Sequence, residues 1–282
     1  MTGTVGLKVT LGRWSTEGIV PLSHSFDTPG LLAGSVADVA YGFAALDPAL
    51  GDADRFLAEC GTLSLNGVRI AVDDAFFWTD CDPGIAETAR EAVDALARKG
   101  AALRRATLHE AADAYAVFLE GGVSAIELRS FLDRELPDWL GQVDPIMAPA
   151  VRGAEALGAR EYLARLGRLQ SLARQAKQRF DGIDVIATPT LCITPPLLSE
   201  LGTPEAYLNA NRRIVRNTVA VNYLGLCGIT LPVGLDRAGM PVGLQLIAPA
   251  WAEERLLAIA LAAERAVGTP AERLGSPPML AA

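Results

Sequence analysis

Hydrophobic residues alternate with small or polar ones at the very start of the chain. Val5, Leu7 and Val9 are separated by Gly6 and Lys8, which is the period of two typical of a half-buried β-strand. Domains usually begin with loosely held residues, so this pattern indicates a chain that begins inside a hydrophobic core. The same reasoning predicts further strands over 67–77, 102–108, 185–188, 228–234 and 241–249.

Helical periodicity fills much of the remaining sequence. A Ser35 N-cap with Asp38 three residues later predicts a helix over 35–46. An Asp82 N-cap, Pro83 at the first position and Gly100 after the last turn predict a helix over 82–101. Other helices are expected across 109–180, with breaks at 136–139 and 144–149, from about 217 into the following strand, and over 252–268.

The order of these elements predicts an α/β layered fold with a central mixed β-sheet flanked by helices. Residues 67–108 fit a strand–helix–strand unit, whereas 109–180 interrupts the alternation of strands and helices. We therefore expect a single domain over 1–282 that contains a mainly helical insertion at about 109–180. That insertion is where we expect substrate specificity to vary.

Composition and charge narrow the class of partner. The 282 residues are 50% hydrophobic and 21% charged, with a net charge of −8, as in a globular protein. This acidic balance argues against nucleic-acid or anionic-membrane binding, which needs clustered basic residues. The one dense basic stretch, Arg212, Arg213 and Arg216, is interpreted as a solvated helix face. No apolar run approaches the roughly 20 residues of a membrane span.

The four cysteines, Cys60, Cys81, Cys192 and Cys227, are too far apart in the sequence for the usual zinc motifs. Without a secretory signal, they are expected to be reduced thiols in a cytoplasmic protein. His24 and His109 are the two histidines, and the chain has no G-x-S-x-G, H-E-x-x-H, P-loop or G-x-G-x-x-G motif. No metal or cofactor is expected, and the residues alone reveal no reactive group.

One block near the N-terminus resembles the amidase signature family. Residues 3–40 match that family's G-x-x-G-L-K-P-T-x-G-R segment and the following G-x-x-P-L-S-x-S-x-D-T-x-G-P-x-A-R-S-V-x-D segment. Residues 184–190, DVIATPT, resemble its D-x-h-x-x-P-T strand, where h is hydrophobic. Residues 222–249 resemble its N-x-x-G-x-P-x-x-x-x-P-x-G…G-x-P-x-G-x-Q region. The resemblance covers essentially the whole chain and implies an amidase signature fold whose N-terminal part is missing.

Some positions depart from the family pattern. Val9 and Leu31 stand where proline is usual, and Gly34 stands where arginine is usual. The two proline replacements are expected to be tolerated. Gly34 removes a charged group near the start of the helix predicted over 35–46, which leaves the local packing less defined.

The resemblance implies hydrolysis of a carboxamide to a carboxylate and ammonia or an amine through a serine acyl-enzyme. In the family, a second serine beside a cis peptide bond relays the proton to a lysine. Transferred residue by residue, the nucleophile, the relay serine and the lysine all fall before Met1. No catalytic residue is therefore expected in this chain, which is predicted to be inactive alone. Lys8, Lys99 and Lys177 are not expected to replace the lysine, because their positions fit structural roles.

Part of the substrate pocket is nevertheless expected in this chain. Either the segment after strand 185–188 and the helix-to-strand segment line it, or these residues only shape the edge of the sheet. Phe77 and Trp78 either form an apolar wall of the pocket or pack against the next helix. The substrate-binding candidates are Thr188, Pro189, Thr190, Asn222 and Gly225.

Two functional hypotheses remain open. The first is an amidase-type hydrolase acting on a small-molecule amide, and the second is a non-catalytic pseudoenzyme or a binding subunit of a split assembly. In both, exposed sheet edges and apolar surface favour association, either as a homodimer or with the missing N-terminal portion.

Overall fold

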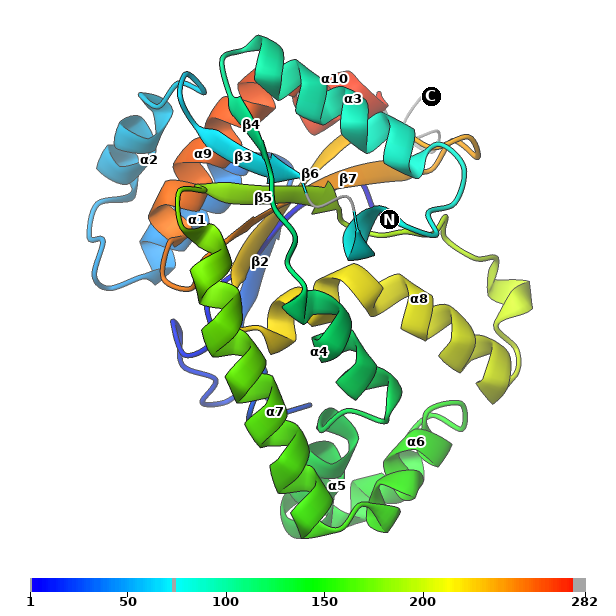
Figure 1. Ribbon diagram of the computed structural model, residues 1–282. Helices are drawn as coiled ribbons and strands as arrows, with labels where there is room; N and C mark the ends of the chain where they lie inside the picture. Colours follow the sequence, from blue (N-terminus) through cyan, green and yellow to red (C-terminus); the bar gives the residue numbers. More distant parts are fainter. Residues whose placement is uncertain (1, 73–74, 276–282) are drawn as a thin grey trace, which may run out of the picture.

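Seven strands form one mixed sheet in the part of the chain that the structure describes (Figure 1). The structure is a computed structural model, and it describes residues 2–72 and 75–275. The strand order is β2-β1-β6-β7-β5-β3-β4. β3 pairs in parallel with β4 and β5, and the other neighbours are antiparallel. The strands are β1 (Val5–Lys8), β2 (Gly30–Ala33), β3 (Arg69–Val72), β4 (Ala102–Arg105), β5 (Val185–Pro189), β6 (Cys227–Leu235) and β7 (Pro241–Ala248).

Helices lie on both sides of this sheet (Figure 1). One layer packs on the sheet and consists of α1 (Val36–Leu46), α3 (Ile85–Arg98), α9 (Glu253–Val267) and α10 (Pro270–Leu274). α2 (Ala53–Gly61) packs on the outside of this layer, against α1 and α9. The other group lies below the sheet in Figure 1 and consists of α4 (Glu110–Leu119), α5 (Ser124–Glu135), α6 (Ala148–Gly153), α7 (Ala159–Lys177) and α8 (Pro204–Tyr223). Within residues 2–72 and 75–275, none of these helices combines the length and apolar character that a membrane span requires.

The hydrophobic pattern correctly predicted the central elements. Val5, Leu7 and Val9 are buried, as the alternation at the start of the chain requires. Ser35 caps α1, its side-chain oxygen accepting a hydrogen bond from the Asp38 N–H at 3.1 Å. The seven-stranded sheet with helices on both sides confirms the α/β layered prediction.

The predicted start of the helix over 82–101 was wrong. α3 begins at Ile85 behind Gly84, whose φ of +94° favours glycine. A Cβ at Gly84 would lie 2.7 Å from the backbone nitrogen of Arg237, so a close approach of another loop sets this turn. Asp82 does not cap the helix. Its carboxylate accepts the Thr194 N–H at 2.9 Å.

The basic stretch lies on α8, where Arg212 and Arg213 are exposed, as the sequence suggested, and Arg216 is partly buried. α8 begins at Pro204, directly after its N-cap Thr203 and well before the expected start near 217. Arg213 forms an ion pair with Asp82 at 2.8 Å, and Arg216 donates to the carbonyl of Thr79 at 2.8 Å. The two arginines therefore fasten α8 to the loop that leads into α3.

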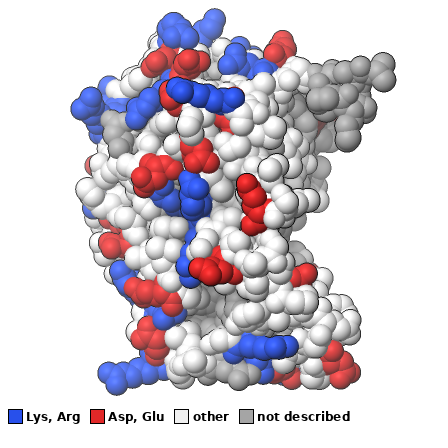
Figure 2. Space-filling model, turned by 90° about the vertical axis from the view of Figure 1, so that its right-hand side faces the viewer, with Lys and Arg blue, Asp and Glu red and all other residues white. Residues whose placement is uncertain are grey.

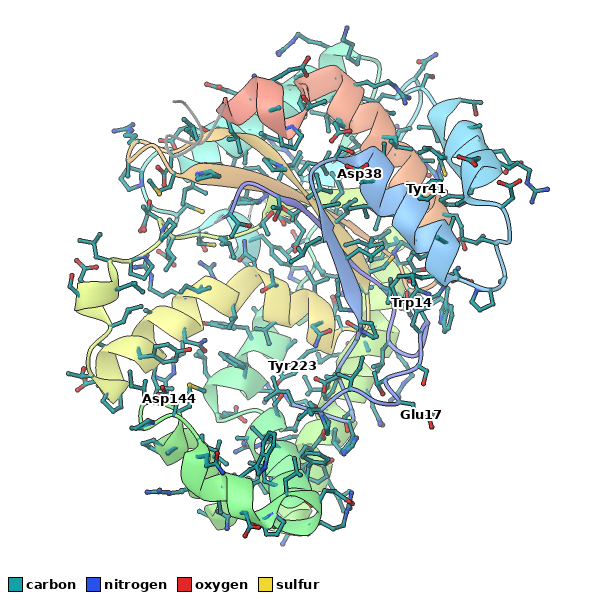
Figure 3. All side chains as sticks on the ribbon, turned by 180° about the vertical axis from the view of Figure 1, so that it is seen from behind. Trp14, Glu17, Asp38, Tyr41, Asp144 and Tyr223 are labelled. Carbon is teal, nitrogen blue, oxygen red and sulfur yellow. The ribbon has the colours of Figure 1, made fainter. Side chains whose placement is uncertain are left out.

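α4, the first helix of 109–180, packs against both α7 and α8. As expected, prolines break this region, and Pro137 begins a short 3-10 helix, Pro137–Gln142. Tyr223, the last residue of α8, faces the 109–180 segment (Figure 3), where a Cβ at Gly122 would lie 2.6 Å from its hydroxyl oxygen. Its ring also contacts Phe26 with centroids 4.8 Å apart.

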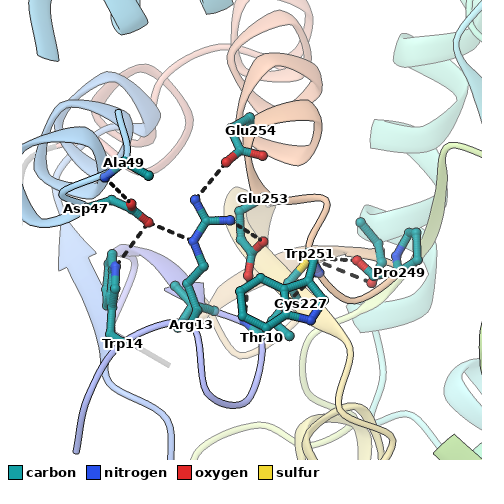
Figure 4. Close-up of polar contacts among 12 residues, drawn as sticks. Thr10, Arg13, Trp14, Asp47, Ala49, Cys227, Pro249, Trp251, Glu253 and Glu254 are labelled. Carbon is teal, nitrogen blue, oxygen red and sulfur yellow. Dashed lines mark hydrogen bonds and ion pairs between the residues drawn. The ribbon is translucent and has the colours of Figure 1, made fainter. Parts of the chain in front are cut away.

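A buried ionic cluster ties the N-terminal segment to the C-terminal helix (Figure 4). The Arg13 guanidinium contacts the carboxylates of Asp47 at 2.7 Å, Glu254 at 2.7 Å and Glu253 at 3.4 Å. Glu253 is fully buried and accepts the Thr10 N–H at 2.6 Å. Removing the cation would leave the Glu253 carboxylate buried without a charged partner, which is costly.

We expect Arg13→Met to lower the free energy of unfolding by about 3 kcal/mol, because it breaks a buried ion pair on one side only. Chemical denaturation followed by circular dichroism measures this change. The matched control is Arg55→Met, which removes an exposed pair with Glu59 at 3.6 Å and should cost less than about 0.5 kcal/mol. Equal losses of unfolding free energy in the two variants would contradict the stabilising role of the buried Arg13 cluster.

Candidate functional site

The two faces of the sheet differ in character. Ile229 and Leu231 of β6 are buried in the core with α3 and α9. Thr230, between them, points to the opposite face because side chains alternate along a strand. Strand pairing extends a row from Thr230 in both directions on this second face. The row contains Leu32, Gly6, Thr230, Gln245 and Thr188.

A cavity of about 150 Å³ opens over one end of this row. It lies where residues 2–4 meet β2, β6, β7 and the segment that follows β5. Thr190 and Thr230 meet in its lining, with their hydroxyl oxygens 2.5 Å apart. The lining residues are Thr2, Gly3, Thr4, Leu32, Ile85, Thr190, Leu191, Ile193, Thr230, Pro232, Pro241, Val242 and Gly243.

Gly243 makes the contact between the two hydroxyls possible. A Cβ on Gly243 would lie 2.6 Å from the Thr230 Oγ1 and 2.7 Å from the Thr190 Oγ1. The Gly243 carbonyl also accepts the Thr190 N–H at 2.8 Å, which holds the residue after β5 against β7. The absence of a side chain at one position therefore allows two threonines from distant strands to meet.

The hydroxyl pair can bind a polar ligand. In such a pair one hydroxyl donates to the other, so the second hydroxyl keeps its proton for another acceptor. Among the described residues, no other hydrogen-bond partner is found for either oxygen. The pair can therefore donate one hydrogen bond to a carbonyl or carboxylate oxygen in the cavity.

The structure separates the three candidates at the end of β5. Thr190 lines the cavity, as described above. Thr188 is fully buried and its hydroxyl accepts a hydrogen bond from the Gln245 side chain at 3.2 Å. The Pro189 carbonyl accepts from the Asn217 side chain at 2.7 Å. Thr188 and Pro189 thus support the wall of the cavity from behind.

Asn222 and Gly225 are placed elsewhere. Neither belongs to the cavity lining. Asn222 donates to the Phe26 carbonyl at 3.0 Å, and Gly225 has a φ of +66° in the turn between α8 and β6. The geometry gives both residues structural contacts, and their role in substrate binding stays a prediction.

Lys8 is the unusual lysine of the three. Its ammonium group donates to the carbonyls of Val9 at 2.8 Å and Leu226 at 2.9 Å. Burial lowers the pKa of Lys8 to about 8, against the attraction of nearby Cys227 and Glu253. The two carbonyl contacts fit the structural role expected for Lys8. Lys99 is the C-cap residue of α3, and Lys177 is the last residue of α7.

Phe77 and Trp78 pack inward and do not line the cavity. Phe77 is fully buried in the core, and the Arg90 guanidinium lies 4.5 Å above the Trp78 ring. Of the two alternatives for this pair, packing around α3 is the one that the structure shows.

The sequence predicted neither a metal site nor a surface for nucleic acid, and the described residues bear on both. No group of three or more His, Cys, Asp and Glu side chains within 2–72 and 75–275 could hold a metal ion. On the face drawn in Figure 2, acidic and basic side chains are interspersed. That distribution gives the drawn face no strong charge of one sign.

The sequence interpretation missed Thr230, Gly243 and Leu32 as cavity residues. Gly243 lies in the G-x-P-x-G-x-Q segment quoted above, and the alternation along 228–234 places Thr230 opposite the core residues. These two patterns could have identified Gly243 and Thr230 from the sequence. Leu32 could not be placed from the sequence, because its strand was not predicted.

Comparisons with known proteins agree on one family. The Amidase family model matches residues 1–257. A 2-amino-5-chloromuconic acid deaminase from Comamonas testosteroni is 44% identical over 277 residues, covering 98% of this chain and 59% of that protein. An indoleacetamide hydrolase from Agrobacterium vitis is 30% identical, covering 95% of this chain and 60% of that protein.

A solved structure has the same fold. The structure of 6-aminohexanoate cyclic dimer hydrolase superposes on this chain with a TM-score of 0.81 at 25% identity. The match covers 97% of this chain and 62% of that one. The chain thus spans about three fifths of the length of the relatives it matches.

We expect Gly243→Ala to destabilise the chain by about 2 kcal/mol, the cost of overpacking a filled site, because the new methyl group meets both threonine hydroxyls. Thermal and chemical unfolding measure the loss. Gly167→Ala is the matched control, since its Cβ meets nothing within 4 Å in the middle of α7. That variant should be stabilised by up to about 1 kcal/mol. A neutral Gly243→Ala would contradict the close approach.

Proposed function

The chain belongs to the amidase family, and on this premise we propose that it forms part of a hydrolase that cleaves the C–N bond of a carboxamide. The reaction would proceed through a serine acyl-enzyme and give a carboxylate and ammonia or an amine. The observation that carries the proposal for this chain is the Thr190–Thr230 hydroxyl pair in a cavity beside residues 2–4. In the family resemblance, residues 3–40 follow the segment that bears the nucleophile.

The role of the hydroxyl pair would be to orient the substrate. One free hydroxyl proton can bind the oxygen of an amide or carboxylate group, which holds the scissile bond in a fixed position. A cavity of about 150 Å³ is comparable in size to one that accepts benzene. We therefore favour a small or aryl amide as substrate.

The catalytic serine, relay serine and lysine would come from residues that precede Met1 in a longer form of the protein. About two fifths of the length of the relatives has no counterpart in residues 1–282. Lys8 donates to two backbone carbonyls and is not a substitute for the missing base. We infer that residues 1–282 alone do not hydrolyse amides.

The residues that precede Met1 in the longer form would also cover the exposed edge of the sheet. β2 ends the sheet, and Leu32 on β2 is 80% exposed although it lines the cavity. An exposed edge strand with a large apolar side chain is a typical site of association. Covering this edge would also close the cavity over its apolar rim.

We further infer that 1–282 is part of a single amidase-type domain in which 109–180 is an insertion. α4 to α7 lie between β4 and β5 without adding a strand to the sheet, and α4 packs against α8. An insertion placed in this way can vary between relatives without disturbing the sheet. The four free thiols support the expected cytoplasmic location.

The decisive experiment compares residues 1–282 with a chain extended upstream in the coding DNA. We expect the extended chain to release ammonia from simple amides and to react with a fluorophosphonate serine probe, and 1–282 to do neither. Light scattering on 1–282 tests what covers the β2 edge of the sheet. A stable dimer would mean that a second copy of the chain covers β2. Labelling or turnover by 1–282 alone would contradict the proposal. No activity in either chain would favour the non-catalytic alternative.

In the active extended chain, Thr190→Val should lower kcat/KM about tenfold, the effect of losing one neutral hydrogen bond. Thr218→Val is the matched control, because its hydroxyl donates to the Val215 carbonyl within α8, outside the cavity. Steady-state kinetics on both variants distinguish them. Equal activity of the two variants would remove Thr190 from the substrate site.

A further inference from the structure

Cys81 and Cys192, which are far apart in the sequence, lie side by side in the fold. The Asp82 N–H donates a hydrogen bond to the Cys192 carbonyl at 2.8 Å, and the Asp82 carboxylate accepts one from the Thr194 N–H at 2.9 Å. These two contacts align the loop before α3 with the segment after β5. The Thr79 carbonyl accepts the Cys81 thiol at 3.8 Å and an N–H of Arg216 at 2.8 Å. The same guanidinium contacts the Cys192 sulfur, so both sulfurs lie around one arginine.

One cation lies against this pair. The Arg216 guanidinium lies 3.7 Å from the Cys192 sulfur, where it can stabilise a thiolate. The Asn217 side-chain oxygen accepts a hydrogen bond from the Cys192 thiol at 3.3 Å, which holds the Cys192 side chain in place. The neighbouring Cys81 thiol and the Arg216 charge lower the pKa of Cys192, although burial opposes them. The neighbouring Cys192, together with burial, raises the pKa of Cys81. The pair therefore loses its first proton more easily than an isolated buried thiol does.

The two other thiols lack this arrangement. Burial raises the pKa of Cys60 to about 11 and that of Cys227 to about 12. Cys227 is also fully buried, whereas Cys81 is half-buried and within reach of solvent. Reactivity of a thiol follows its thiolate character and its access, so the four cysteines divide into one reactive pair and two inert residues.

We propose that Cys81 and Cys192 form a reversible covalent modification site that reacts with low-molecular-weight disulfides such as glutathione disulfide. The pair first loses one proton to solvent from Cys192. The accessible Cys81 sulfur then attacks one sulfur of the reagent while its proton passes to the Cys192 thiolate. The S–S bond of the reagent breaks, and one thiolate leaves. Cys192 then attacks the Cys81 sulfur and displaces the second thiol, which takes up the proton. The two cysteines are oxidised to a disulfide, and the reagent is reduced to two thiols.

The resulting bridge would join the loop before α3 to the segment that carries Thr190. Cys192 is two residues after Thr190, whose hydroxyl meets Thr230 in the cavity. A covalent link here fixes one wall of the cavity from behind. This chemistry does not depend on the proposed amide hydrolysis, because it uses residues outside the cavity lining.

The test treats folded residues 1–282 with glutathione disulfide and identifies the products by peptide mass spectrometry. We expect one Cys81–Cys192 disulfide per chain, unmodified Cys60 and Cys227, and full reversal by dithiothreitol. The oxidised chain should have a higher Tm, because the bridge closes a long loop in the unfolded state. A glutathione adduct that persists on wild-type Cys81, or no reaction at either cysteine, would overturn the proposal.

Variants separate the two roles. Cys192→Ser should stop at a stable glutathione adduct on Cys81, and Cys81→Ser should leave the buried Cys192 unmodified. Cys60→Ser is the matched control and should form the bridge at the wild-type rate. A measurement on the wild-type chain needs no variant: phenylarsine oxide, which binds two adjacent sulfurs, should bind once and block bridge formation. Failure of the arsenical to bind would contradict the side-by-side placement.

Discussion

The fold depends on an ionic contact that joins the two ends of the sequence. Glu253, at the start of α9, is fully buried and binds both the Thr10 N–H and the Arg13 guanidinium. A buried carboxylate must be paired to be tolerated, so the segment after β1 can occupy essentially one position against α9. That constraint keeps β1 between β2 and β6. The cavity beside residues 2–4 follows from it, because β1 carries those residues to the open face of β6 and β7.

The two faces of the sheet have different roles: one packs in the hydrophobic core, and the other carries the polar residues of the cavity. On the core face, Ile229 and Leu231 pack against helices and provide the hydrophobic stabilisation. On the other face, small and polar residues replace large apolar ones, and Gly243 lets the hydroxyls of Thr190 and Thr230 approach to 2.5 Å. Main-chain pairing in the sheet fixes where each of these side chains leaves its strand, so the two hydroxyls are held in one orientation.

Side-chain contacts between loops hold the surroundings of this site. Arg213 and Arg216 of α8 reach the loop before α3, and Asn217 binds the carbonyls of both Phe77 and Pro189. The same contacts bring Cys81 beside Cys192. The wall behind the cavity therefore contains a cation, a buried amide and two thiols within one connected set of hydrogen bonds. A change in the oxidation state of the thiols would act directly on the segment that carries Thr190.

The sequence by itself determined the fold class, most strands and helices, and the family, because periodicity and the motif around Gly6 and Lys8 are local signals. It also marked Thr190, since that residue ends the D-x-h-x-x-P-T strand. Only the tertiary structure decided which residues meet across strands: Thr230 with Thr190, Arg13 with Glu253, and Cys81 with Cys192. The short edge strand β2 and the true start of α3 also went unpredicted. Each of these depends on a neighbour distant in the sequence, such as Arg237 against Gly84, and a local pattern carries no information about such a neighbour.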